Sequence, residues 1–248
     1  MLAAGACERQ VHLGDIGDGA AAVLWSSTFE VGDLSEWSKD GHGGAFFDNA
    51  TAGPSATSEV AHRGRFAGMA TVTTMPGTTS ISYLFRNQPS VPEAYYSAWF
   101  YIPTSFAVKT WLSLIHFNGS RSGDGSDLSA LWDLNLYPRL DGSLVAHLYD
   151  YVAQTNLEQT VPAPVPVARW VHFEVFIRKA ADATGDIAVW QDGVSILDNR
   201  NVVTAANDWL QWDVGGSSDD VTPPRAVVYV DDAAISLARL GTRDWSGP

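Results

Sequence analysis

Short runs of β-branched and aromatic residues recur along most of this chain, separated by Gly, Pro, Asn, Asp and Ser. Such runs are typical of β-strands joined by turns, and no stretch keeps a helical period over a dozen residues. Asp-Gly pairs at 141–142 and 192–193 stand between alternating runs and predict hairpins. The sequence therefore predicts an all-β protein, with strands near residues 66–74, 80–85, 95–102, 111–117, 130–138, 143–152, 170–178, 186–197 and 225–236.

These runs form one continuous stretch, which we expect to fold as a single domain over residues 24–248. The chain has 248 residues, 46% of them hydrophobic, and all-β sandwiches of this size often form one core. Residues 1–23 lack the strand pattern. Their first seven, MLAAGAC, resemble the end of a truncated bacterial lipoprotein signal, in which Cys7 would carry the lipid anchor. The alternative is an incidental thiol in an N-terminal linker.

The formal net charge of −13 disfavours nucleic acid and anionic membranes as partners, and it attracts divalent cations. No run approaches the roughly 18 apolar residues that a membrane-spanning helix needs. Together with the lipoprotein-like start, these features predict a secreted or surface-anchored bacterial lipoprotein. We expect it to be a monomer without a membrane span.

Alternation along two neighbouring strands predicts one polar surface, because successive strand residues point to opposite faces. In both strands, at 130–138 and 143–152, polar positions alternate with apolar ones, and only a short turn separates the two. They are therefore expected to pair, with His116 of the 111–117 strand beside them. The merged surface would carry Asp133, Asn135, Tyr137, His147, Tyr149 and Tyr151.

Two adjacent carboxylates, Asp231 and Asp232, interrupt the last strand-like run. Buried side by side, they would repel each other unless something neutralised them. One solution is an exposed strand end, where arginines or backbone N–H groups pair with them. The other is a bound cation.

Several segments, taken in order, carry a family resemblance: FEVGDLSEW, RGRFAGMATVTT, YYSAWFYIPTSF, RWVHFEVFIRKA, VWQDGVSILD and VYVDDAAIS. Over residues 28–236 the chain resembles the concanavalin A-like jelly rolls of the polysaccharide lyases (the heparin lyase I and alginate lyase-like group) and their glycan-binding relatives. The resemblance implies an antiparallel β-sandwich and a polysaccharide partner. It also implies a structural Ca²⁺ where the first and last strands meet, held by Glu30 and Asp231, with Asp232 a weaker candidate.

The lyases of this group cleave uronate chains by β-elimination. That reaction needs a group to neutralise the carboxylate, a base for the C5 proton and an acid for the leaving oxygen. The resemblance places the base at His116, although the family's Gln is Leu114 here, and it places the neutraliser at Arg86, without the following Glu-Leu. The family's late Tyr falls on Ser217.

The missing Tyr leaves Tyr149 or Tyr151 as the acid in a lyase hypothesis, with Arg86 or Arg139 on the uronate carboxylate. The departures from the family's motifs favour a second hypothesis. In it, the protein is an extracellular polysaccharide-binding jelly roll with a structural calcium, and it binds glycan through Asp133, Asn135, Tyr137, Arg139 and His147.

Overall fold

The computed structural model describes residues 23–88 and 91–242, which form an antiparallel β-sandwich of the jelly-roll type. The predicted fold class is therefore confirmed. A short helix, α1 (Ser35–Ser38), follows the first strand. The strands are β1 (Val23–Ser27), β2 (Gly43–Asp48), β3 (Ser55–Thr57), β4 (Ala67–Val72), β5 (Ser80–Gln88), β6 (Glu93–Tyr101), β7 (Ala107–Val108), β8 (Leu112–Ser120), β9 (Leu128–Pro138), β10 (Leu144–Asp150), β11 (Thr155–Leu157), β12 (Trp170–Arg178), β13 (Gly185–Gln191), β14 (Val194–Val202), β15 (Leu210–Ser218), β16 (Val221–Thr222) and β17 (Ala226–Ser236).

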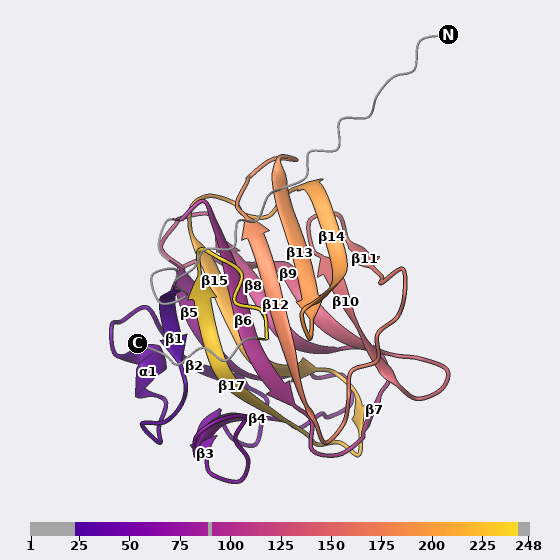
Figure 1. Ribbon diagram of the computed structural model, residues 1–248. Coiled ribbons are helices and arrows are strands. Elements are labelled where there is room, and N and C mark those ends of the chain that lie inside the picture. Colours follow the sequence, from indigo (N-terminus) through magenta and orange to yellow (C-terminus); the bar gives the residue numbers. More distant parts are fainter. Residues whose placement is uncertain (1–22, 89–90, 243–248) are drawn as a thin grey trace.

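Two large sheets make up the sandwich. The first sheet has the order β14-β13-β12-β6-β17-β4-β3, with β1 also paired to β17, and the second has the order β11-β10-β9-β8-β15-β5-β2. Figure 1 shows β17, β6, β12 and β13 of the first sheet in front of the strands of the second sheet. Neighbours such as β8 and β15 are far apart in the sequence, so the chain passes back and forth between the sheets.

The alternation that predicts the strands also decides which side chains fill the core. On β12, Val171, Phe173, Val175 and Ile177 are buried, and they belong to one hydrophobic cluster shared by both sheets. Residues of period two on a strand lie on one face, so this face is the inner side of the sandwich. The opposite face of β12 is also covered in part, because Glu174 accepts a hydrogen bond from the backbone N–H of Leu240.

Each strand predicted from the sequence is present, including the hairpins at 141–142 and 192–193. The sequence pattern missed the strands β1, β2 and β15 and the short strands β3, β7, β11 and β16. The predicted domain starts within one residue of β1. Residues 1–22, with the lipoprotein-like segment and Cys7, lie outside the described residues.

The last strand differs from expectation in one respect. β17 lies between β6 and β4, inside the first sheet, and Asp231 and Asp232 are buried rather than at an exposed strand end. They lie at a bulge, where the pairing with β6 shifts between Asp231 and Ala234. Asp232 has a φ of 45°, a left-handed conformation that the bulge imposes. The expected pairing of the first and last strands is confirmed, since β1 pairs with β17.

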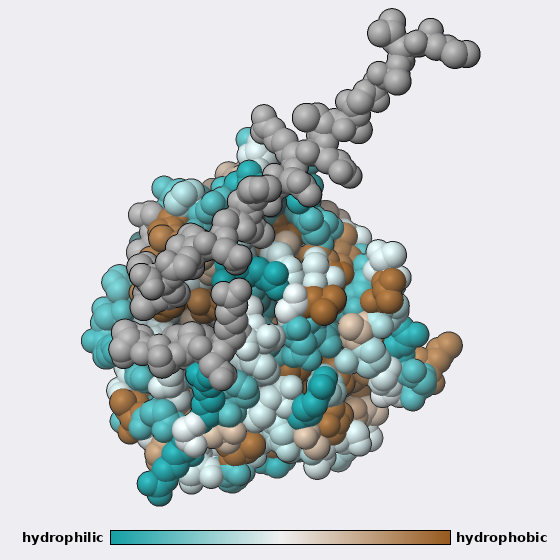
Figure 2. All heavy atoms as spheres, in the orientation of Figure 1, coloured by the Kyte–Doolittle hydropathy of each residue, from teal (hydrophilic) through white to brown (hydrophobic). Residues whose placement is uncertain are grey.

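The surface in front of the first sheet carries hydrophilic side chains with scattered hydrophobic ones (Figure 2). Single exposed apolar residues are normal on soluble domains. None of the helices in the described ranges is long and apolar enough to cross a membrane.

The shared core predicts a large loss of stability on truncating Phe173, which is fully buried and packs against Phe100. We expect Phe173→Ala to lower the free energy of unfolding by about 3–5 kcal/mol, because it leaves a cavity between the sheets. The matched control is Phe46→Ala, since Phe46 is 49% exposed. Its effect should stay within about 0.5 kcal/mol. Equal losses in urea denaturation would contradict this assignment of the core.

Candidate functional site

A row of polar side chains crosses the outer face of the second sheet. In the strand register, Asp213 on β15 pairs with His116 on β8, His116 pairs with Asp133 on β9, and Asp133 pairs with Tyr149 on β10. We call these four residues the His116 row. Because they are direct cross-strand neighbours, their side chains share one face. Four separate strands thus contribute to one site.

His116 and Asp133 form the centre of this row. The Nδ1 atom of His116 lies 3.2 Å from the Oδ1 atom of Asp133. The hydroxyl of Tyr151 donates a hydrogen bond of 2.8 Å to Asp133 Oδ2, and its ring stacks with that of His116 at 6.0 Å. The Nε2 atom of His116 is buried and makes no hydrogen bond. An aspartate on Nδ1 favours the tautomer in which Nε2 carries the lone pair.

The structure also adds residues that the sequence analysis did not name. Asp213 accepts a hydrogen bond of 2.9 Å from the side-chain amide of Asn118, and the amide of Gln211 donates to Asn87. Tyr83 lies edge-on to His116. The alternation of LQWDV is the signal for Gln211 and Asp213, because apolar residues separate these polar positions.

Burial sets the protonation of this site. Asp133 and Asp213 are only 2% and 7% exposed. Burial raises the pKa of Asp133, and the nearby His116 opposes this rise. Burial and the charge of Asp133 together raise the pKa of Asp213 well above its usual value. Both carboxyls therefore favour their neutral form more than an exposed aspartate does.

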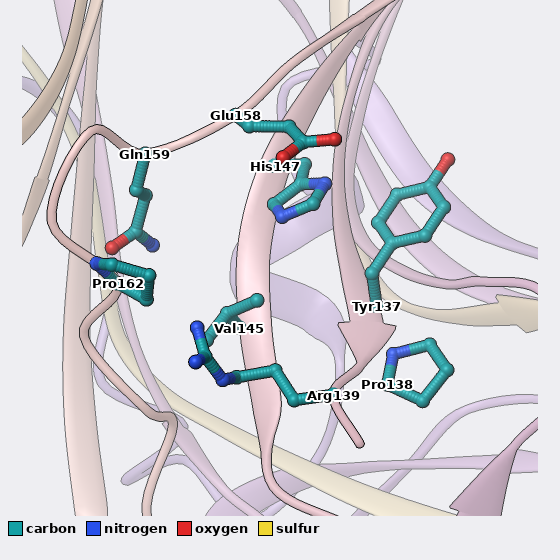
Figure 3. A pocket seen from close by; sticks show the side chains of 8 residues that line it. All are labelled: Tyr137, Pro138, Arg139, Val145, His147, Glu158, Gln159 and Pro162. Atoms are coloured by element: carbon teal, nitrogen blue, oxygen red, sulfur yellow. The ribbon is translucent and has the colours of Figure 1, made fainter.

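A pocket of about 330 Å³ adjoins this row, lined by residues of β9, β10 and the segment that follows β11. In Figure 3 the rings of Tyr137 and His147 lie side by side, stacked at 4.7 Å, with the carboxylate of Glu158 near His147. Arg139 lines the same pocket. Asn135 connects the pocket to the row, because it pairs with His147 on β10. The predicted binding residues on β9 and β10 thus share one face of the second sheet, and Arg139 follows β9.

Arg86 is the predicted site residue that the structure separates from the others. It pairs in register with Trp212, whose side chain is in the core, so its own side chain points away from His116. Its guanidinium donates to the carbonyl of Trp37 and to both carboxylate oxygens of Asp40, and it lies over the ring of Trp25. Arg86 therefore holds the first segments of the chain against the sandwich.

The expected calcium ligands already have backbone partners. Glu30 Oε1 accepts the N–H groups of Arg65 and Phe66, and Asp231 Oδ2 accepts that of His62. The His62 ring lies 2.7 Å from Asp232 Oδ2. Burial, and then Asp232, raise the pKa of Asp231 to about 7. Within the described residues no three His, Cys, Asp or Glu side chains are grouped to hold a metal.

The fold and the site together define the class of protein. It is a jelly roll with a row of polar, partly buried side chains across one sheet. The model of the polysaccharide lyase family matches residues 29–234. The protein therefore belongs to the polysaccharide lyase family. A comparison with curated proteins found no match.

Solved structures show the same fold. An endo-β-1,4-glucuronan lyase from the fungus Trichoderma reesei has a TM-score of 0.62 and 20% identity, covering 86% of this chain and 95% of that one. The cellulose induced protein Cip1 has a TM-score of 0.59 and 18% identity, with 88% and 99% covered. An alginate lyase from Aplysia kurodai has a TM-score of 0.54 and 12% identity, with 86% and 98% covered.

The position of Arg86 predicts that it contributes to stability. It is 4% exposed and makes charge-assisted hydrogen bonds to Asp40. We expect Arg86→Gln to lower the free energy of unfolding by about 2–3 kcal/mol, because those bonds are lost beside buried aromatic rings. Arg121→Gln, at an exposed position, is the control. Equal urea midpoints for Arg86→Gln and the unmodified protein would contradict this role.

Proposed function

We propose that the protein is a polysaccharide lyase that cleaves a uronate-containing glycan by β-elimination. Membership of the polysaccharide lyase family supports this hypothesis over glycan binding alone. The observation that carries it is the arrangement of His116, Asp133 and Tyr151, which brings a base, its orienting carboxyl and a hydroxyl acid into contact. A polysaccharide laid across the strands would follow the His116 row.

His116 is the proposed base. Its contact with Asp133 leaves the Nε2 lone pair to remove the C5 proton of the uronate. Asp133 would then stabilise the imidazolium that forms, as an aspartate behind a catalytic histidine does in other enzymes. This role needs the sugar ring to come within hydrogen-bond reach of His116.

Tyr151 is the proposed acid. Burial, followed by the charge of Asp133, raises its pKa, so its hydroxyl keeps its proton. That hydroxyl would exchange Asp133 for the glycosidic oxygen of the bound chain and protonate it as the bond breaks. Tyr149, which packs edge-on against Tyr151, is the alternative. Its hydroxyl donates to Gln154, away from Asp133.

Cleavage by β-elimination leaves an unsaturated sugar that absorbs ultraviolet light, and this signal tests the proposal. We expect the signal with at least one substrate among glucuronan, alginate, heparin and hyaluronan. His116→Gln and Tyr151→Phe should each lower the rate by about 10²–10⁴-fold, because each removes a proton-transfer group. His42→Gln, at an exposed site, is the matched control. No product with any of the four glycans would contradict the proposal.

Glycan binding without cleavage is the second candidate function. The stacked rings of Tyr137 and His147 beside Arg139 support it, because flat rings stack on sugars and a guanidinium pairs with carboxylates. Retention on a glycan affinity gel without any unsaturated product would favour this function.

Extracellular location, a lipid on Cys7 and a monomeric state stay predictions from the sequence. Mass spectrometry of the protein from its native membrane fraction would detect the mass of acyl chains on Cys7. Sedimentation would measure the oligomeric state.

Calcium also stays a prediction, based on the family resemblance. An ion bound by Glu30 and Asp231 would replace their backbone N–H partners. Binding to the folded state alone raises the free energy of unfolding by about 2.7 kcal/mol at a hundredfold excess over Kd. We therefore expect a higher thermal midpoint in Ca²⁺ than in a chelator, and no such difference in Glu30→Gln. Identical midpoints in the unmodified protein would rule the site out.

A further inference from the structure

Asp213 has an oxygen atom whose hydrogen-bonding capacity is unused. Its Oδ2 accepts the amide of Asn118, whereas its Oδ1 is buried and has no partner. The residue is 7% exposed and is the direct cross-strand neighbour of His116. A buried carboxyl oxygen without a hydrogen-bond partner destabilises the folded protein. We infer that a ligand supplies the missing partner.

The groups that face Asp213 come from three neighbouring strands of the second sheet. They are Tyr83 and Asn87 on β5, His116 and Asn118 on β8, and Asp133 on β9, with Tyr149 and Tyr151 beyond Asp133. The arginine of β5, Arg86, points to the other face. The two acids therefore lie on either side of one histidine.

We propose that Asp213, beside His116, forms a carboxylic-acid site that binds the carboxylate of the uronate sugar. Asp213 donates a hydrogen bond from its protonated Oδ1 to a carboxylate oxygen of the sugar. In this role it replaces the arginine or side-chain amide that another site could use as the donor. This inference rests on the proposed function, since it places a uronate beside His116. It makes Asp213 a substrate-binding residue that selects uronates over neutral sugars.

In the proposed complex, Asp213 and the uronate carboxylate would share one proton. Two carboxylates in one buried site cannot both be ionised, so the second group to enter keeps or brings a proton. An O–H donor to an ionised acceptor makes a short, strong hydrogen bond. Partial neutralisation of the uronate carboxylate would also make its C5 proton easier for His116 to remove.

The site has a consequence for pH. Asp213 must be protonated to bind the sugar, and burial with the charge of Asp133 raises its pKa. Above that pKa, binding must take up one proton, and affinity falls about tenfold for each pH unit. A basic side chain in the same role would show no such loss near neutral pH.

The test is calorimetric binding of a β-1,4-glucuronate tetrasaccharide to the full-length His116→Gln variant, in which turnover is blocked. Binding is measured from pH 4.5 to 8.5 in pairs of buffers that differ in ionisation enthalpy. We expect proton uptake to rise toward one as the pH passes the pKa of Asp213 in the free protein. Cellotetraose, which lacks carboxylates, should bind without proton uptake.

Asp213→Asn in the same background separates the proposal from a general effect of charge. Its amide places an N–H₂ donor where the acid O–H was, and it still accepts from Asn118. We expect affinity that no longer falls with pH, and no proton uptake. Asp213→Leu should lose most of the affinity at every pH, whereas Asp182→Asn, in an exposed loop, should behave as its parent does.

The fold of Asp213→Asn is tested by its pH-dependent stability. A carboxyl whose pKa is raised by folding stabilises the protein while protonated, and that contribution is lost as pH rises from the unfolded pKa to the folded one. The variant should remove this part of the pH slope in urea denaturation. Binding without proton uptake, no binding of the tetrasaccharide, or an unchanged pH profile in Asp213→Asn would overturn the inference. Lyase activity in the unmodified protein, assayed separately, would leave the proposed function standing.

Discussion

The register of β15, β8 and β9 decides which side chains share the outer face of the second sheet. A slip of one residue in any of these strands would move its polar residues into the core. The register of β15 includes a bulge between Val214 and Ser217. Gly215 lies there with a φ of 142°, and a Cβ at this position would be 2.3 Å from the carbonyl oxygen of Ser82. Glycine thus permits β15 to pair closely with β5 at this bulge.

Local strand pairing made the part of the site on β9 and β10 predictable from the sequence. β9 and β10 are joined by a short hairpin, so alternation and the turn together fix the partners of Asp133 and Asn135. The place of Asp213 in the site could not be predicted, because the pairing of its strand is not local. Its strand pairs with β8 across a separation of 97 residues in the chain, and a sequence pattern alone does not fix such a long-range register. The alternation in LQWDV indicates a strand, but no nearby sequence feature identifies the strands that pair with it.

Arg86 and Asp231 show a second limit on predicting the site from the sequence. A motif resemblance predicts a position along the chain, whereas the function of a side chain depends on the face it occupies. Arg86 is one residue from Phe85, the direct neighbour of Asp213, and this single step places it in the aromatic cluster of Trp25 and Trp37. The resemblance also does not predict the bulge at Asp231, where the side chain accepts the N–H groups of His62 and Asp232.

For an acidic protein to bind a polyanion, its binding site must be less negative than the protein as a whole. The net charge of −13 repels a uronate chain at long range, and salt screens that repulsion beyond about 10 Å. At the His116 row, burial favours neutral carboxyls, because an isolated ionised group is far more costly to bury than a neutral one. The burial that raises the pKa of Asp213 would make this carboxyl a hydrogen-bond donor, whereas Asp133 accepts from Tyr151 and faces His116. The low dielectric of the site, rather than an added arginine, would then make a uronate acceptable there.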